Sequence, residues 1–329
     1  MNDYAAAAVD GPVVPVRSRG GYRQSVLVVG TAQFGGAYGI ANRTGVPDDD
    51  ATARILAAAR DLAVTHLDTA RAYGDSERRI GAALHGHAPL DLAVVTKVAP
   101  LDGAVADDAV GAARAVRASV DASRAALRWT GPLTLLLHRA VDAAAGGGAG
   151  WQELRRCLVT GEADRIGVSV QSPDELRRAL DLPDLGYVQL PCNILDRRWL
   201  VADLAASLAD RPDLVVTVRS AYLQGLLVAG TGVRWPHLSD AERDAVVATL
   251  DRLVADLGRD DRADLCLAYL LSLPWVTSVV VGAETEEQLR RNADLVRRAP
   301  ITAAERGQVL SALPEMPVAL LDPSQWPAC

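Results

Sequence analysis

Short apolar runs alternate with longer amphipathic stretches along most of this 329-residue chain. The runs are nearly continuous in apolar character and rich in valine and leucine. This pattern predicts strands that are buried on both faces, as in a parallel sheet. We expect eight such strands, at residues 25–30, 64–68, 92–97, 133–138, 165–169, 187–191, 214–220 and 276–282.

The amphipathic stretches between these runs predict helices. Ser172 ahead of Pro173, and Thr285 ahead of two glutamates, are favourable residues for a helix start. We expect helices at 48–62, 76–86, 107–128, 151–160, 173–180, 199–209, 262–272 and 285–298, with two further helices at 238–258 and 302–312.

The repeated alternation of strand and helix predicts an α/β fold, a single-domain (β/α)8 TIM barrel with extra loops and helices at its C-terminal side. The alternative is an open doubly wound sheet, which usually carries a closely spaced glycine fingerprint after its first strand. Here that turn reads GTAQFGGAYG, which is spaced too loosely. We expect the barrel to span 23–329, after a flexible N-terminal arm at 1–22, and GGGAG at 146–150 to form a flexible loop.

Composition narrows the classes of partner. The net charge is −7 and the arginines are interspersed with acidic residues, which argues against nucleic acid and anionic membranes. The first residues do not resemble a signal peptide and no run reaches the ~18 apolar residues of a spanning helix, so we expect a cytoplasmic protein. The four cysteines lack metal-binding spacing, so no metal is expected, and nothing indicates an oligomeric state.

Lys97 is the only lysine among 34 basic residues. Arginine is permanently charged and planar, whereas lysine is a compact ammonium group whose pKa responds to its surroundings. Because arginine replaces lysine everywhere else, we expect Lys97 to perform a task that arginine cannot. It stands at the end of a predicted strand, in AVVTKVAP.

Three neighbouring predicted strands end in ionisable residues. Asp68 ends the second strand, with Tyr73 in the following loop, Lys97 ends the third and His138 ends the fourth. In (β/α)8 barrels the chemistry lies at these strand ends, so the four side chains should converge. A cation beside a phenol favours loss of its proton, an aspartate holds the lysine, and a histidine orients a substrate oxygen. This combination suits reduction of a carbonyl, which needs a proton at oxygen when a hydride reaches carbon.

These residues carry a resemblance to a known family. The segment HLDTARAYGDSERRIGAAL (66–84) resembles the signature of the aldo-keto reductases, and VVTKV and LLLHRA resemble the lysine and histidine segments of that family. The resemblance covers about residues 25 to 298. It implies a (β/α)8 barrel, a nicotinamide cofactor across its mouth, and carbonyl–alcohol interconversion. It also implies that Asp68, Tyr73, Lys97 and His138 form a catalytic tetrad, with Tyr73 as the proton donor.

The resemblance further implies a set of cofactor-binding residues. One expected ring-stacking position holds Arg219, where the family commonly has an aromatic residue. A cation there should favour the reduced cofactor or engage an anionic substrate; alternatively, Arg219 pairs with a nearby acid. The expected cofactor-binding residues are Gly30, Thr31, Asp68, Ser169, Gln189, Arg219, Ser220, Ala221, Tyr222, Gln224, Gly225, Arg234, Gly282, Ala283, Glu284, Thr285, Gln288 and Asn292.

The choice between the two nicotinamide dinucleotides depends on residues near the expected adenosine site. Glu284 stands where relatives often have serine, and its charge would repel a 2′-phosphate. Arg234 could offset that repulsion. We expect NADP(H) on family grounds, with NAD(H) as the alternative.

The substrate is expected to be a small carbonyl compound, an aldehyde or a ketone such as that of a sugar. Few aromatic residues are present, which favours a polar substrate. The alternatives to a reductase are a redox-neutral epimerase that retains its cofactor, and a nicotinamide-binding regulatory subunit. The expected substrate-contacting residues are Phe34, Tyr38, Arg139, Trp151, Trp235 and Trp326.

Overall fold

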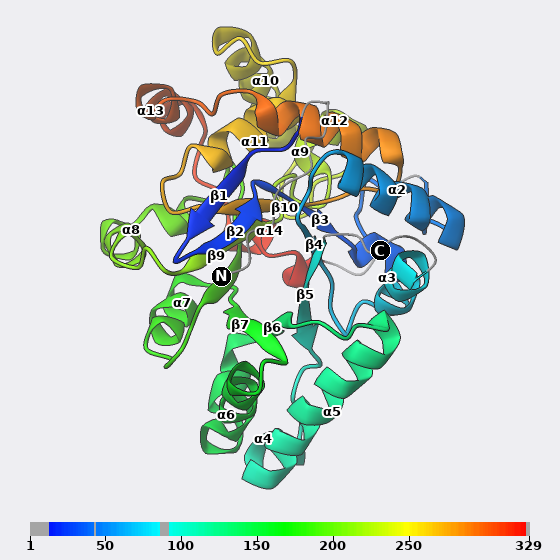
Figure 1. Cartoon of the computed structure of the whole chain (residues 1–329). Helices are drawn as coiled ribbons and strands as arrows, with labels where there is room; N and C mark the ends of the chain where they lie inside the picture. The colour runs from blue at the N-terminus through cyan, green and yellow to red at the C-terminus, as the bar shows by residue number, and fades with distance from the viewer. Residues whose placement is uncertain (1–12, 43, 86–91, 327–329) are drawn as a thin grey trace.

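The computed structural model describes residues 13–42, 44–85 and 92–326, which form a closed barrel of parallel strands wrapped by helices (Figure 1). The strands follow one another in chain order around the barrel, and the last strand pairs with the first to close it. This confirms the predicted (β/α)8 barrel and all eight predicted strands. They are β3 (Leu27–Gly30), β4 (His66–Asp68), β5 (Ala93–Val98), β6 (Leu133–Leu137), β7 (Ala163–Ser169), β8 (Tyr187–Pro191), β9 (Val215–Arg219) and β10 (Ser278–Gly282).

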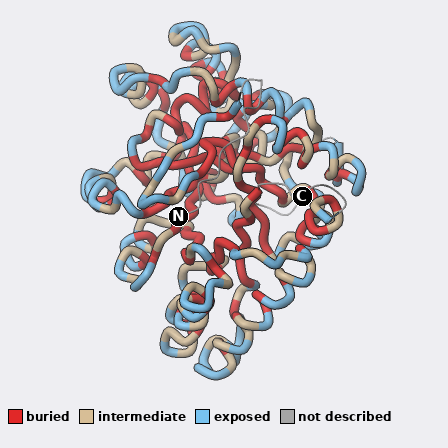
Figure 2. Tube along the Cα trace, viewed as in Figure 1, coloured by how far each residue is buried: buried red, intermediate tan, exposed pale blue. Residues whose placement is uncertain are grey.

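The helices cover the outside of the barrel, and burial follows this arrangement: the strands and the inner helix faces are buried, while the outer helix faces are exposed (Figure 2). None of the helices described is long and apolar enough to cross a membrane. The main helices are α2 (Asp49–Asp61), α3 (Ser76–His85), α5 (Ala109–Leu127), α6 (Ala145–Val159), α7 (Pro173–Leu180), α8 (Ala202–Ala209), α10 (Asp240–Asp256), α11 (Arg262–Leu271), α12 (Glu286–Arg297) and α13 (Ala303–Ala312).

Shorter helical turns lie in the connections. They are α1 (Ala32–Gly35), α4 (Ala104–Asp107), α9 (Leu226–Ala229), α14 (Val318–Leu321), η1 (Ala140–Ala144), η2 (Arg197–Leu200), η3 (Gly230–Gly232) and η4 (Pro323–Gln325).

Helix starts follow the capping residues in the sequence. The Ser172 hydroxyl accepts from the backbone N–H of Glu175 at the start of α7, 3.2 Å away. Thr285 caps α12 in the same way, accepting from the N–H of Gln288 at 3.2 Å. Such caps satisfy N–H groups that have no partner within the helix. Both predicted starts are confirmed.

A hairpin closes the amino-terminal end of the barrel, formed by β1 (Val16–Arg19) and β2 (Tyr22–Ser25). The Tyr22 hydroxyl lies 2.8 Å from both Thr134 Oγ1 and His66 Nε2, near the beginnings of β6 and β4. The prediction of a flexible arm over 1–22 is therefore wrong for this segment, because polar contacts inside the barrel hold it. The first twelve residues lie outside the described ones.

The glycine run at 146–150, predicted as a flexible loop, lies at the start of α6, where the helix is kinked. Gly146, Gly147 and Gly148 have φ of 56°, 65° and 92°, in the region that favours glycine. A Cβ on Gly146 would come within 2.7 Å of the Ala109 Cα at the start of α5. The run therefore lets the kinked start of α6 pack closely against α5.

Candidate active site

The Lys97 ammonium lies at the centre of a buried cluster at the carboxyl ends of β4 and β5. Its Nζ donates to both carboxylate oxygens of Asp68, at 2.8 and 2.9 Å, and to the backbone oxygen of Thr69 at 3.0 Å. Lys97 is 1 % exposed and Asp68 4 %. Burial by itself would lower the pKa of Lys97, but Asp68 and Tyr73 favour the charged form, and the pKa lies above its usual value. The ammonium group is therefore held charged and fixed.

Tyr73 meets this ammonium group. Lys97 Nζ lies 3.4 Å from the Tyr73 hydroxyl and 4.9 Å from the centre of its ring. The loop that carries Tyr73 packs against Gly35, where a Cβ would overlap the Tyr73 backbone oxygen at 1.6 Å. Gly74, with φ of 50°, faces the Gly35 backbone from the other side. Two glycines thus allow the close packing that positions the phenol.

His138 completes the group. Its ring centre lies 5.8 Å from that of Tyr73, and the two rings are perpendicular. Burial lowers the pKa of His138 to about 4, with contributions from the positive charges of Lys97, Arg219 and Arg139. The imidazole is therefore neutral near pH 7, and its buried Nδ1 has no hydrogen-bond partner in the described structure. The structure brings together all four side chains predicted for the tetrad.

A cavity of about 390 Å³ opens beside this group and runs between the ends of β3, β9 and β10. This volume falls within the usual range for small-molecule sites. Asp68 and Tyr73 line it at one end. Of the other residues predicted to bind a cofactor, those lining it are Gly30, Thr31, Arg219, Ser220, Ala221, Tyr222, Gln224, Gly225, Gly282, Glu284, Gln288 and Asn292.

Five residues predicted for cofactor binding do not line this cavity. Arg234 is exposed and lies outside it, which corrects its predicted role in offsetting Glu284. Ala283 is buried, and Thr285 caps α12. Ser169 is buried at the end of β7, and Gln189 is buried in the middle of β8.

Gln189 has an unused acceptor. Its Nε2 donates to Asp68 Oδ1 at 2.8 Å, while its fully buried Oε1 has no hydrogen-bond partner in the described structure. An unsatisfied buried carbonyl costs free energy unless a partner arrives. Gln189 therefore has the capacity to accept a hydrogen bond from a group bound next to Asp68.

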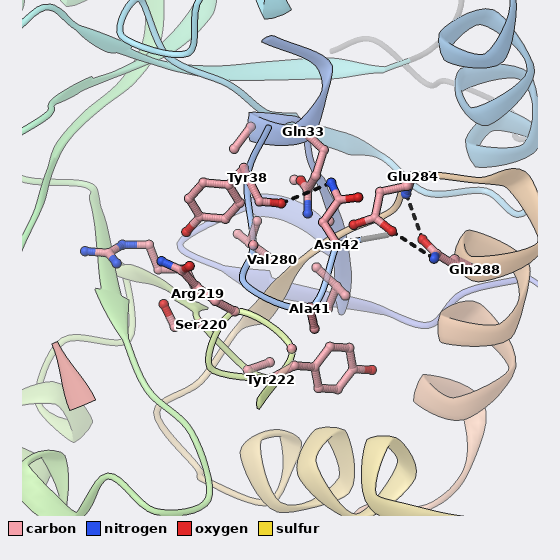
Figure 3. Close-up of a pocket in the computed structure, with 18 of the residues that line it drawn as sticks. Gln33, Tyr38, Ala41, Asn42, Arg219, Ser220, Tyr222, Val280, Glu284 and Gln288 are labelled. Atoms are coloured by element: carbon pink, nitrogen blue, oxygen red, sulfur yellow. Dashed lines mark hydrogen bonds between the residues drawn. The ribbon is translucent and has the colours of Figure 1, made fainter. Parts of the chain in front are cut away.

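Sequence reasoning missed one wall of the cavity, formed by the loop after α1 (Figure 3). The backbone N–H of Ala41 donates to the backbone oxygen of Gln224 at 3.4 Å, and both residues line the cavity. A Cβ on Gly225, which has φ of 93°, would come within 2.5 Å of the Ala41 Cβ. The glycine-rich run GGAYGIAN (35–42) was the sequence feature that could have indicated a loop packed closely against the cavity. Around the whole cavity, on this loop and on other elements, the lining residues that the sequence analysis did not predict are Ala32, Gln33, Gly39, Ala41, Asn42, Val228, Ala229, Ala263, Val280, Val281 and Arg291.

Glu284 connects the loop after α1 with helix α12 at the far end of the cavity. Its Oε2 accepts from Thr44 Oγ1 at 3.2 Å and from Gln288 Nε2 at 3.0 Å, the latter drawn in Figure 3. Arg291 lines the same end and is paired with Asp261. One acidic and one basic side chain therefore face this part of the cavity.

Several residues predicted to contact a substrate prove to be core residues. Phe34, Trp151 and Trp235 are at most 2 % exposed, and the two indole N–H groups donate to backbone oxygens. Their burial contradicts a role at an open pocket. Arg139 forms ion pairs with Asp102 and Asp142.

The remaining two predicted substrate-contacting residues, Tyr38 and Trp326, are not fully buried. Tyr38 is 42 % exposed and lines the cavity. Trp326 is partly buried and donates to the Leu320 backbone oxygen at 3.0 Å. Of the six predicted substrate-contacting residues, Tyr38 is the one placed on the cavity wall.

The arrangement is that of a barrel enzyme whose chemistry lies at the carboxyl ends of its strands. A model of the Aldo/keto reductase family matches residues 26–313, and the chain belongs to this family. Aldo-keto reductases are oxidoreductases that use nicotinamide cofactors and reduce carbonyl compounds. The family membership predicted from the sequence is confirmed.

Solved structures share the fold. The holo form of the aldo-keto reductase AKR11C1 from Bacillus halodurans is 21 % identical, with a TM-score of 0.74 over 92 % of this chain and 97 % of that one. Its apo form gives a TM-score of 0.67 over the same shares, also at 21 % identity. PA4992 from Pseudomonas aeruginosa is 22 % identical, with a TM-score of 0.63 over 89 % of this chain and 98 % of that one. A comparison with curated proteins finds no match.

Proposed function

We propose that this chain is an NAD(P)H-dependent reductase that converts an aldehyde or ketone to an alcohol, with Tyr73 as the proton donor. The observation that carries the proposal is the contact between the buried Lys97 ammonium and the Tyr73 hydroxyl at the edge of the cavity. A bound nicotinamide cofactor supplies the hydride. The chain's own residues supply the proton and hold the carbonyl oxygen.

Each member of the tetrad has one task in this proposal. The Tyr73 hydroxyl donates its proton to the carbonyl oxygen, and the adjacent Lys97 charge stabilises the phenolate that remains. Asp68 keeps Lys97 charged and in place. His138 is neutral, so it directs the carbonyl oxygen toward Tyr73 by a hydrogen bond without competing as an acid.

The residues around the cavity fit a nicotinamide dinucleotide. The unpartnered Gln189 Oε1 would accept from the carboxamide N–H group, beside Asp68. The segment 220–225 and the loop after α1 would enclose the rest of the molecule. We propose NADP(H) as the preferred form, with Arg291 rather than Arg234 as the cation available to its 2′-phosphate. NAD(H) is the alternative, which the neighbouring Glu284 favours.

Titration with NADPH and NADH tests this function directly. Binding of either cofactor should quench tryptophan fluorescence, and a panel of small polar aldehydes and ketones should then consume the reduced cofactor. Saturable binding without turnover of any carbonyl would favour a regulatory subunit. A product of inverted stereochemistry with no net cofactor change would favour an epimerase. Absence of binding would contradict the proposal.

A further inference from the structure

Arg219 is held at the active-site end of the cavity by a chain of two side-chain hydrogen bonds, through Gln171 to Asp322. It is the last residue of β9 and lines the cavity together with Tyr73 and Tyr38. Its Nη2 donates to Gln171 Oε1 at 2.5 Å, and Gln171 Nε2 donates to Asp322 Oδ1 at 2.9 Å. Figure 3 shows Arg219 beside Ser220 at the end of its strand. The guanidinium is therefore positioned, and its one hydrogen bond in the described part of the chain leaves most of its donors unused.

Among the described residues, no acidic side chain balances the charge of Arg219. Three cations lie close enough to His138 to lower the pKa of that imidazole: Lys97, Arg219 and Arg139. Asp68 neutralises Lys97, and two aspartates neutralise Arg139. Among the described residues no carboxylate lies within ion-pairing distance of Arg219. The described structure therefore does not contain the direct acid pairing that was the alternative for this residue.

An unbalanced arginine in a partly enclosed site fits an anionic ligand. The guanidinium presents a planar fork that pairs with carboxylate or phosphate through two parallel hydrogen bonds. Because one edge is anchored to Gln171, the orientation of this fork is set before a ligand binds. Little side-chain freedom is then lost on binding, which strengthens the interaction.

We infer that Arg219 binds an anionic group of the substrate, so that the substrate class is a carbonyl compound that also carries a carboxylate or a phosphate. The inference rests on the proposed reductase function. The carbonyl oxygen meets Tyr73 and the anionic group meets Arg219, on the wall of the same cavity. Gln171 and Asp322 are positioning residues for this contact.

Matched pairs of aldehydes test this selectivity. Succinic semialdehyde is compared with its methyl ester, and glyceraldehyde 3-phosphate with glyceraldehyde; the two pairs separate carboxylate from phosphate. In the wild type, kcat/KM should favour the anionic member of one pair by about tenfold to a hundredfold, the usual strength of a hydrogen bond to a charged group. Arg219→Gln should reduce that ratio to near one, chiefly through KM. Arg219→Lys should retain part of it, because lysine keeps the charge but not the fork.

A control separates this effect from a general change in charge. Arg114→Gln removes an exposed arginine from α5 and should leave the ratio as in the wild type. A wild type that turns over both members of each pair equally would overturn the inference while leaving the reductase function intact. So would an Arg219→Gln variant with an unchanged ratio and weakened cofactor binding, since Arg219 would then serve the cofactor.

Binding measurements keep the inference testable apart from catalysis. Isothermal titration calorimetry compares benzoate with benzamide, and adds inorganic phosphate as a third probe. Benzoate or phosphate should bind at least about tenfold more tightly than benzamide in the wild type, with the difference lost in Arg219→Gln. Equal affinities of the wild type and Arg219→Gln for both anions would overturn the inference, whether or not any aldehyde is reduced.

Discussion

At the scale of single residues, Lys97 shows why one lysine survives in a chain that otherwise uses arginine. Its ammonium reaches Asp68, Thr69 and Tyr73 from a position that is 1 % exposed. A guanidinium is larger and planar, and it cannot place a compact charge between these acceptors. The space around Nζ therefore requires lysine, which agrees with the interpretation drawn from the sequence.

Replacing Lys97 with methionine should both inactivate and destabilise the protein. The substitution leaves the Asp68 carboxylate buried without its cation, which costs about 3 to 5 kcal/mol when a buried pair loses one partner. Thermal unfolding measures that loss, and steady-state reduction measures activity. The double variant Lys97→Met/Asp68→Asn should recover much of the stability but none of the activity. Recovery of both would contradict the role assigned to Lys97.

Glu284→Ser should shift cofactor preference toward NADPH. The Glu284 carboxylate faces the same end of the cavity as Arg291, so removing its charge removes a repulsion toward a 2′-phosphate bound there, while Arg291 keeps its ion pair with Asp261. The ratio of dissociation constants for NADH and NADPH should rise by about tenfold, comparable to one charged hydrogen bond. Glu287→Ser removes the same charge from the exposed first turn of α12 and serves as the control. An equal change in both variants would count against the argument.

At the scale of elements, the hairpin at the amino-terminal end of the barrel depends on a neutral histidine. His66 is 3 % exposed, and its ring nitrogens contact Thr65 Oγ1 at 2.7 Å and the Tyr22 hydroxyl at 2.8 Å. Burial lowers the pKa of His66 from 6.5 to about 4. Between these values the unfolded chain binds a proton that the folded protein excludes. The contribution of His66 to stability is thus complete above pH 6.5 and is lost as the pH falls toward 4.

The acid sensitivity of the fold should therefore depend on His66. Between pH 6.5 and 4, protonation of this residue should remove about 3 kcal/mol from the free energy of unfolding. Urea titrations of the wild type and His66→Asn across this range measure the difference in slope. The variant should be less stable near pH 7 but less sensitive to acid. His237→Asn alters an exposed histidine and is the control; parallel pH profiles for wild type and His66→Asn would contradict the assignment.

At the scale of the whole molecule, the sequence predicted the barrel because each strand is buried on both faces and therefore nearly continuous in apolar residues. The tetrad followed from the same topology, which fixes where strand ends meet. The hairpin was missed because VRSRGGYRQS is polar. Its burial comes from hydrogen bonds inside the barrel, such as Gln24 to Tyr187 at 3.0 Å, which are not visible as apolar periodicity.

Long-range packing explains the other errors. Phe34, Trp151 and Trp235 were expected at the mouth because their loops lead there, yet their rings turn into the core. The loop after α1 joins the cavity through its backbone contact with Gln224, which no local sequence pattern specifies. The sequence could therefore not predict the direction in which the side chains of these loops point, because long-range packing determines it.

The central claim is that the Tyr73 hydroxyl, beside Lys97, donates the proton during carbonyl reduction. The most direct measurement compares single-turnover reduction rates of the wild type and Tyr73→Phe at saturating reduced cofactor. Tyr269→Phe is the matched control, because the buried Tyr269 hydroxyl has no hydrogen-bond partner in the described structure. Tyr73→Phe should bind cofactor normally and react about a hundredfold to ten-thousandfold more slowly, the usual contribution of a general acid. A rate within a few-fold of the wild type, with Tyr269→Phe unaffected, would contradict the account.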